Sequence, residues 1–460
     1  MQFNSTIFLA FLVIVVVVFH QLTIPYRRAF LLLASYAFYW VWSIPFSLLL
    51  LGSTFVDYTA ARWIEASPRN AVRRLALMMS MMFNLGALGL FKYSDFLTNS
   101  AYSLFGVHPW PVLDLILPLG ISFYTFQTMS YTIDVYRRQI PARRSLMDVA
   151  LYVSFFPQLV AGPIVRADVL MPQLGGEDRP LDWTRMRRGL GLLLWGMTKK
   201  VLIADAMGNI ANEVYGAPER FGGIDLVMGT YAFAAQIYCD FSGYTDIALG
   251  AALLIGIRLP KNFESPYLAC SIGEFWRRWH ISLSTWLRDY LYIPLGGNRR
   301  GVRRTYFNLM ATMLLGGLWH GAGWNWVVWG GLQGGMLCFE KIVGLSAKPR
   351  NRLTATCRWF ITLNLVCLSW VFFRAHGLDE AMLVLQRVCT GAAGSMSVGW
   401  LPVVYLGGII IAEYFGIRRR WLAFSETSPR GLTWIAYAMV ILFVLIFAGP
   451  SNPEFIYFQF

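Results

Sequence analysis

Apolar runs separated by short polar breaks occupy most of the 460-residue chain. No Lys, Arg, Asp or Glu lies between positions 1 and 25, and the stretch TIFLAFLVIVVVVF at 6–19 is almost uninterrupted. A membrane-spanning helix needs roughly 20 predominantly apolar residues. A cleaved signal peptide is the alternative, but it would carry a basic segment before the apolar run, and this chain has none there. We therefore predict an uncleaved first helix.

Similar runs recur along the chain, although several are short, long or interrupted by Gly and Pro. The pattern predicts an all-α, polytopic membrane protein with roughly ten or more transmembrane helices. The further predicted membrane segments are 29–42 with 46–61, 75–91, 113–131, 149–164, 190–207, 226–257, 307–345, 360–373, 403–415 and 432–447.

The middle of the chain differs from its flanks. Between 118 and 335 the apolar segments carry Gly, Pro, Trp, Tyr and polar side chains, as in QIYCDFSGYTDIALG at 236–250. Irregular polar backbone at membrane depth is tolerated only where it is buried in protein or lines a cavity. The amphipathic segment 272–297 favours a re-entrant or interfacial helix, or a pocket wall.

This contrast predicts one integral membrane domain with three parts. A functional core occupies 113–345, and scaffold helices occupy 1–112 and 346–460.

Composition and charge agree with a membrane location. The chain is 57% hydrophobic and 14% charged, whereas soluble domains carry about 25% charged residues. The net charge of +14 comes from short Arg clusters between apolar runs, which is typical of cytoplasmic loops facing anionic lipid rather than of a nucleic-acid-binding surface. The cluster at Arg27 and Arg28 predicts an amino terminus outside the cell and the next loop inside. The six cysteines form no C-x-x-C pair, so neither a disulfide framework nor a zinc site is indicated.

Five histidines are the first candidates for chemistry. His20, His108 and His376 lie at the ends of runs or in loop-like sequence, where a structural role is the favoured interpretation. His280, in RRWHISLS, and His320, in GGLWHGAGWNWVVWG, lie in the irregular middle segment. Ionisable groups at membrane depth are costly and are functional or well paired. Burial disfavours the imidazolium form, and a neutral imidazole can act as a general base or simply bond to a carbonyl.

Asp240 and Asp246 lie six positions apart in YCDFSGYTD. Two carboxylates could bind a metal, but no third carboxylate or histidine follows at ligand spacing, so a hydrogen-bonded structural network is the favoured interpretation and no metal site is predicted. No P-loop, G-x-G-x-x-G, H-E-x-x-H or G-x-S-x-G sequence accompanies them.

Several long motifs, in order along the chain, resemble those of the membrane-bound O-acyltransferase (MBOAT) family, and within it most closely the bacterial alginate O-acetylation branch. The resemblance covers roughly 113–335, and the motifs lie at 155–166, 240–250, 262–299 and 308–330. It implies that His320, in the family's WHG motif, is the catalytic residue and that His280 is a second functional residue facing the same central tunnel. Further candidates for substrate binding or the tunnel wall are Trp279, Trp319, Asp240, Tyr244, Arg277, Arg278 and Gln333.

Two sequence features leave questions open. Relatives of the alginate type commonly have a histidine where this chain has Gln333, and an amide cannot exchange a proton near neutral pH. This departure suggests a branch acting on cellulose or another exported glycan. Gly316, Gly317 and Gly321 flank His320, and they suit either close approach of backbone or substrate, or tight packing between helices.

The resemblance implies a mechanism. An acetyl thioester such as acetyl-CoA, which is a substrate and not a bound cofactor, would approach from the cytosol and be held by arginines such as Arg277, Arg278, Arg299 or Arg300. The acyl group would cross the bacterial inner membrane to a periplasm-facing acetyltransferase that modifies the polysaccharide. The alternatives are a transporter with His320 in a proton or substrate pathway, and a non-catalytic scaffold.

Overall fold

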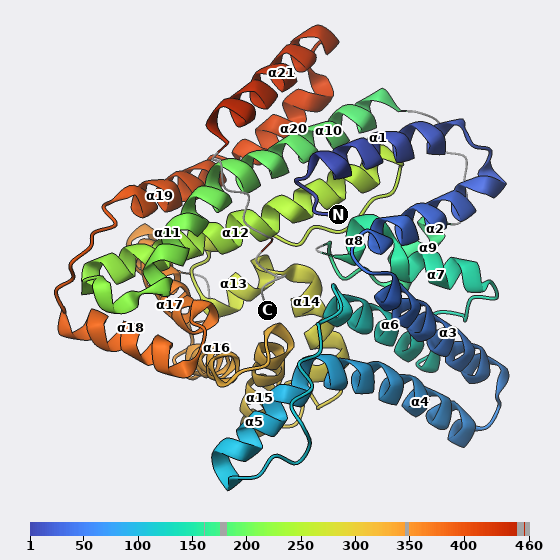
Figure 1. Cartoon of the computed structure of the whole chain (residues 1–460), viewed down its shortest axis with the longest axis horizontal. Helices are drawn as coiled ribbons and strands as arrows, with labels where there is room; N and C mark the ends of the chain where they lie inside the picture. Colours follow the sequence, from blue (N-terminus) through green and yellow to red (C-terminus); the bar gives the residue numbers. More distant parts are fainter. Residues whose placement is uncertain (161, 175–181, 346–348, 449–454, 456–460) are drawn as a thin grey trace. The chain divides into compact units, whose positions relative to one another are not determined.

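The structure is a computed structural model that describes residues 1–160, 162–174, 182–345, 349–448 and 455. Throughout these residues the regular elements are helices, and extended backbone pairs only in an isolated parallel bridge between Phe221 and Met396. The predicted all-α fold is therefore confirmed (Figure 1).

Two compact units divide the chain. The first comprises Met1–Leu190 with Ala248–Pro260, and the second comprises Gly191–Ile247 with Lys261–Phe460. The long helices α10 (Trp183–Thr198) and α12 (Gly223–Leu254) contribute residues to both units.

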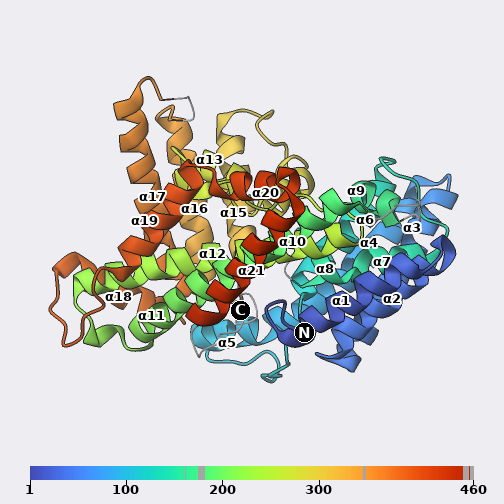
Figure 2. The same ribbon diagram turned by 90° about the horizontal axis from the view of Figure 1, so that it is seen from above.

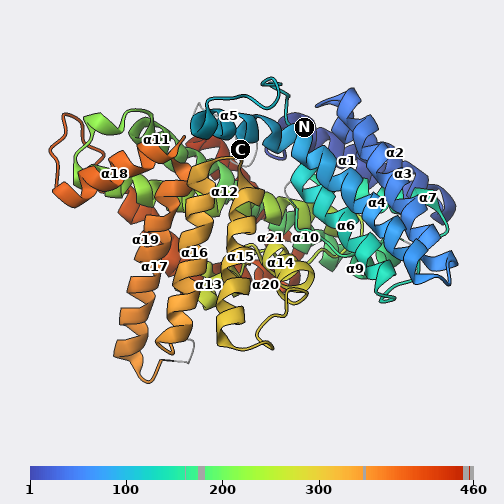
Figure 3. The same ribbon diagram turned by 90° about the horizontal axis from the view of Figure 1, so that it is seen from below.

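The first unit also contains α1 (Thr6–Gln21), α2 (Ile24–Trp40), α3 (Ile44–Ala66), α4 (Asn70–Leu88), the π-helical turn η1 (Gly89–Tyr93), α5 (Ser94–Phe105), α6 (Ile121–Tyr136), α7 (Leu146–Ser154), α8 (Phe156–Leu159) and α9 (Ala167–Leu174). Helices α3, α4 and α6 lie side by side (Figures 1 and 3). A buried carboxylate holds them together: Asp57 accepts hydrogen bonds from the Ser80 hydroxyl at 2.5 Å, the Asn84 amide at 2.9 Å and the Thr132 hydroxyl at 3.3 Å. Polar contacts of this kind link helices in lipid, where apolar burial supplies little drive for association.

The second unit also contains the π-helical turn η2 (Lys199–Ala204), α11 (Asp205–Gly216), the short turns η3 (Pro218–Arg220) and η4 (Pro266–Leu268), α13 (Ile272–Arg278), α14 (Ile281–Leu287), the π-helical turn η5 (Arg288–Tyr292), α15 (Val302–His320), α16 (Trp324–Ile342), α17 (Arg352–Arg374), α18 (Leu378–Thr390), α19 (Leu401–Tyr414), α20 (Ile417–Thr427) and α21 (Arg430–Phe447). Helices α15 and α16 pack together as a hairpin, and α17 lies beside α16 (Figures 2 and 3).

Four helical segments of the described chain are long and apolar enough to cross a membrane, or up to five if the bent pair α19–α20 forms one span. They are α3, the succession α4–η1–α5, α17 and α21, and α1 is apolar but shorter. The predicted count of ten or more spans is not confirmed, and it stays a prediction.

Apolar runs in the middle of the sequence fold into shorter or broken helices. The predicted segment 307–345 consists of α15 and α16, separated by an extended turn at Gly321 and Gly323. The predicted segment 149–164 overlaps the short helix α7 and contains the short helix α8, and 190–207 contains the π-helical turn η2. π-Helical turns are rare and are frequent at functional sites. The expected irregularity of the middle of the chain is therefore present.

Candidate active site

His320 is the last residue of α15 and is only 5% exposed. The helix ends there because Gly321 adopts an extended backbone with φ −155° and ψ 153°. A Cβ atom at Gly321 would collide with the indole of Trp326, and one at Gly317 would collide with the Trp326 carbonyl oxygen and with Gly330. Of the two roles left open by the sequence, tight packing between helices is therefore the one that the structure supports for Gly317 and Gly321.

His280 lies between α13 and α14 and is fully buried. Its backbone is left-handed, with φ 42° and ψ 53°, a conformation that L-residues with a Cβ rarely adopt. Asn262 fixes the segment that follows: its carbonyl oxygen accepts the Ile281 amide at 2.9 Å and its side-chain oxygen accepts the Ser282 hydroxyl at 2.7 Å. The surrounding bonds hold His280 in a conformation that its own backbone disfavours, as is common at functional sites.

The structure brings the two predicted catalytic histidines together. Their ring centroids lie 6.3 Å apart at an interplanar angle of 61°. At this separation a single reacting group that lies beside both rings can be reached by both imidazoles. Five aromatic rings surround the pair, each with its centroid 4.7–6.2 Å from the nearer imidazole: Phe241, Trp319, Trp326, Trp329 and Phe373.

His280 lies outside the candidate membrane spans. The aromatic rings around it determine the charge state of its imidazole. Burial lowers the pKa of the His280 imidazole to about 3, because a charged ring would lose its hydration. At neutral pH the ring is therefore uncharged and can act as a hydrogen-bond donor or acceptor.

The two tryptophans predicted beside these histidines lie differently. Trp319 contacts both imidazoles, at 5.9 Å from His280 and 5.0 Å from His320 between ring centroids. Trp279 is 1% exposed and packs against Phe275 and Trp370, with centroids 5.4 and 5.2 Å away.

Gln333 is a buried connector between helices. Its side-chain oxygen accepts the indole N–H of Trp276 on α13 at 3.1 Å, and its amide donates to the Ser369 hydroxyl on α17 at 2.8 Å. Both ends of the amide are used in packing α16 between its neighbours, which is a positional role and needs no proton exchange.

Asp240 and Tyr244 contact a lysine in the π-helical turn η2. Lys200 Nζ lies 3.1 Å from Asp240 and 2.7 Å from Asp205, and it also lies 5.8 Å from the centre of the Tyr244 ring. Asp240 therefore belongs to a buried ion-pair cluster.

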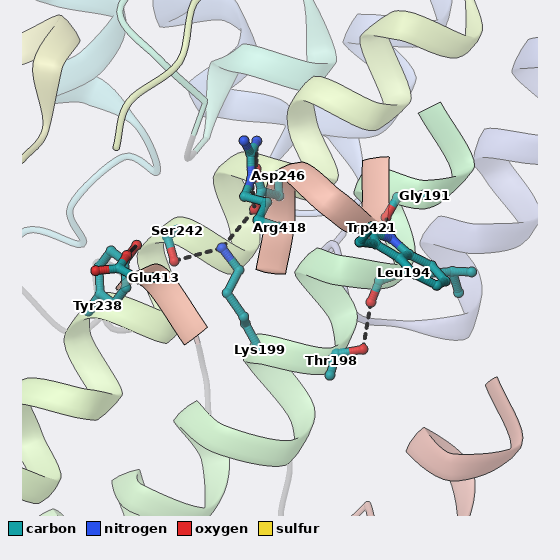
Figure 4. A network of polar contacts seen from close by, with 10 residues as sticks. All are labelled: Gly191, Leu194, Thr198, Lys199, Tyr238, Ser242, Asp246, Glu413, Arg418 and Trp421. Atoms are coloured by element: carbon teal, nitrogen blue, oxygen red, sulfur yellow. Dashed lines mark hydrogen bonds and ion pairs between the residues drawn. The ribbon is translucent and has the colours of Figure 1, made fainter. Parts of the chain in front are cut away.

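Asp246 is the centre of a second polar cluster (Figure 4). Lys199 Nζ lies 2.7 Å from one carboxylate oxygen and 2.8 Å from the Ser242 hydroxyl, and Arg418 of α20 lies 2.6 Å from the other oxygen. Nearby, the Tyr238 hydroxyl donates to Glu413 of α19. In the described residues no group of three His, Cys, Asp or Glu side chains is arranged to hold a metal ion. Both Asp240 and Asp246 are thus engaged in ion pairs.

The predicted phosphate-binding arginines separate into two kinds. Arg278 is committed to an ion pair with Glu274 at 2.6 Å and to the Ser265 carbonyl oxygen at 3.2 Å. Arg277, Arg299 and Arg300 are exposed.

Sequence reasoning did not identify most of the aromatic rings around the histidines. Trp326 and Trp329 follow His320 in the same motif, so their helical spacing of three could have indicated a shared face. Phe241 and Phe373 lie on α12 and α17, and nothing in the sequence relates them to the histidines.

Comparison with known proteins identifies the family to which the chain belongs. A family model described as the membrane-bound O-acyltransferase family matches residues 135–374. A probable alginate O-acetylase, AlgI, of Azotobacter vinelandii is 43% identical over 508 residues, covering 100% of both chains. A peptidoglycan O-acetyltransferase of Helicobacter pylori is 39% identical over 388 residues, which is 78% of this chain and 73% of that one. A teichoic acid D-alanyltransferase of Bacillus subtilis is 28% identical over 289 residues, which is 57% of this chain and 70% of that one.

The chain therefore belongs to the membrane-bound O-acyltransferase family. It is an acyltransferase and a membrane protein, and its similarity to alginate O-acetylases relates it to polysaccharide modification. The transporter and scaffold alternatives explain the buried histidines but not this membership.

Proposed function

We propose that this protein moves an acetyl group from a cytosolic thioester, acetyl-CoA in the simplest case, across the bacterial inner membrane for O-acetylation of an exported polysaccharide such as alginate or cellulose. The relatives support this choice of chemistry, since they include a probable alginate O-acetylase and a peptidoglycan O-acetyltransferase. Gln333, whose side chain hydrogen-bonds to residues of α13 and α17, replaces the histidine that is common in relatives of the alginate type. This difference fits a branch of the family that acts on another polysaccharide.

The observation that carries the proposal is the buried pair of His280 and His320, 6.3 Å apart inside an aromatic enclosure. His320 acts as the general base that takes the proton of the acceptor hydroxyl. His280, uncharged at neutral pH, donates or accepts a hydrogen bond at the same reacting group. Exclusion of water by the surrounding rings strengthens each polar interaction and protects the thioester from hydrolysis.

The remaining parts of the proposal concern access and partners. The exposed Arg277, Arg299 and Arg300 bind the phosphates of the donor, because guanidinium groups pair well with phosphate oxygens. The acyl group passes through a central tunnel in the core 113–345, within a membrane domain of about ten or more spans. A periplasm-facing acetyltransferase with a serine nucleophile receives it.

The test is thioester turnover by the purified protein in detergent. We expect His320→Ala to lower acetyl-CoA hydrolysis or transfer by at least about 100-fold, as expected for loss of a general base. His108→Ala is the matched control, since that ring is exposed and stacks on Tyr102 with centroids 4.2 Å apart. Equal activity of His320→Ala and wild type, with both folded, would remove His320 from the chemistry.

A further inference from the structure

One buried hydrogen-bond donor beside His320 has no structural use. The Trp329 ring meets the His320 ring edge to face, with centroids 5.2 Å apart and an interplanar angle of 88°. The side chain is 1% exposed, and its indole N–H has no hydrogen-bond partner among the described residues. Leaving a buried donor unsatisfied costs about 1–3 kcal/mol, so such a group requires a reason.

Two half-buried indoles in the second unit donate hydrogen bonds. Trp276 and Trp359 each donate to an oxygen, at 3.1 and 2.8 Å. Trp370 makes no well-aligned hydrogen bond, but its indole interacts with the Tyr267 hydroxyl. Trp329 differs from all three, because its N–H is unused and its ring contacts the candidate catalytic side chain of His320.

We propose that the Trp329 indole N–H is a catalytic donor that binds the thioester carbonyl oxygen during acyl transfer at His320. The inference rests on the proposed function and adds a residue to it. Because the two rings are in direct edge-to-face contact, a carbonyl oxygen that accepts the indole N–H at about 2.9 Å would lie beside this contact and not between the rings. In a site closed to water, a donor already fixed at that place stabilises the developing oxyanion without reorganising.

The step balances as an ordinary acyl transfer. The acceptor hydroxyl oxygen attacks the carbonyl carbon while His320 takes the hydroxyl proton, and the carbonyl oxygen becomes an oxyanion bonded to the Trp329 N–H. The C=O bond then re-forms, the C–S bond breaks, and the imidazolium of His320 returns its proton to the leaving thiolate. The products are an acetyl ester and a free thiol.

Position within the fold supports Trp329 as a fixed donor. The ring lies on α16 and stacks on Trp370 of α17, with centroids 5.8 Å apart and an interplanar angle of 17°. It also meets Trp276 of α13 at 5.9 Å and Phe373 at 5.1 Å. With neighbours from three helices, the indole is oriented before substrate arrives.

The first experiment compares two matched substitutions in the purified full-length protein. Trp329→Phe and Trp370→Phe both remove a buried indole from the same stack, but only Trp329 contacts His320. We expect Trp329→Phe to lower kcat for acetyl-CoA turnover about 100-fold, as for loss of one oxyanion donor, with little change in KM. Trp370→Phe should keep kcat near the wild-type value. An equal loss in both variants would mean that Trp329 acts only through packing.

The second experiment removes the donor and keeps the ring, so that a folding defect does not decide the result. Benzothienylalanine in place of Trp329 has the same bicyclic shape with sulfur where the N–H was. Binding is measured for a CoA ketone, in which CH2 replaces the thioester sulfur of acetyl-CoA, and for S-ethyl-CoA, which lacks a carbonyl.

Wild type should prefer the ketone, and the substituted protein should lose that preference by about threefold to tenfold, the size of one hydrogen bond. An unchanged preference would overturn the role of Trp329 and leave the proposed function standing. Failure of the wild type to bind either probe would instead overturn the proposed thioester donor.

Discussion

At the scale of single residues, His280 carries two costs at once. A left-handed backbone costs roughly 1–2 kcal/mol for a residue with a Cβ, and φ is 42° at His280. A buried imidazole also resists protonation. Strained backbone and buried ionisable groups of this kind are common at functional sites, which is consistent with the role proposed for His280.

The pH dependence of stability should report on His280. Burial lowers its folded-state pKa to about 3, against an ordinary value near 6.5. Between these values the unfolded chain binds a proton that the folded chain does not, so stability is fully present above pH 6.5 and falls as the pH is lowered. We expect His280→Asn, which tolerates the left-handed backbone, to flatten the fall in unfolding temperature measured in detergent from pH 6.5 downward.

The control is His108→Asn, because this exposed histidine lies outside the core and should leave the slope of the wild type unchanged. Parallel slopes for His280→Asn and wild type would contradict the assignment of a neutral, buried ring at position 280.

At the scale of elements, the close packing of the α15–α16 hairpin depends on glycine residues at the contact between the two helices. A Cβ at Gly330 would collide with the Met313 carbonyl oxygen, and one at Gly334 would lie 2.9 Å from the Met310 sulfur. Together with Gly317, these positions let the two backbones approach closely. The hairpin thereby places His320, at the end of one helix, against Trp329 of the other.

Substitution of Gly317 by alanine should therefore separate the two helices. We expect Gly317→Ala to destabilise the protein by about 1–3 kcal/mol, the usual cost of overpacking, and to lower activity by moving His320. Gly335→Ala is the matched control on α16, since a Cβ there meets nothing within 4 Å. This variant should be neutral or slightly more stable, because alanine favours helix. The measurements are the unfolding temperature and the turnover rate of the two variants. Equal values for Gly317→Ala and Gly335→Ala would contradict the prediction.

The polar contacts of α12 show that the sequence predicts which residues share a helix face but not which distant residues they contact. Tyr238, Ser242 and Asp246 recur every four residues, so one helix face was readable. Their partners were not, because Arg418 lies 172 positions away from Asp246. Ion pairs between distant segments leave no periodic signal in the sequence, so these partners could be identified only from the structure.

At the scale of the whole molecule, the helical class and the irregular core followed from the sequence, and the two histidines that it proposed as catalytic lie close together in the structure. Long apolar runs predict helices, and the motifs that contain His280 and His320 resemble those of a known family. The count of spans did not follow, because composition does not determine where a run such as 307–345 turns back at Gly321. The aromatic enclosure did not follow either, since Phe241 and Phe373 come from helices with no local relation to His320.

Membrane orientation is the remaining whole-molecule question, and the charges near the amino terminus give an answer. Arg27 and Arg28 lie beside the α1–α2 connection, and Arg69 lies at the α3–α4 connection, with further arginines close by. The α2–α3 connection has no Lys or Arg within ten residues on either side. Because cytoplasmic loops are enriched in these residues, the first and third connections should be inside and the second outside.

Single cysteines test this orientation in a chain whose six native cysteines have been replaced. Ser43→Cys lies at the second connection and Ser67→Cys at the third, and each exchanges one small side chain for another. An impermeant maleimide added to intact spheroplasts should label Ser43→Cys and spare Ser67→Cys, whereas both should react after lysis. Labelling of Ser67→Cys in intact spheroplasts would invert the orientation, and it would put the Arg-rich connections on the side away from the cytosolic donor. Labelling of both would mean that α3, although long and apolar enough to span, does not cross the membrane.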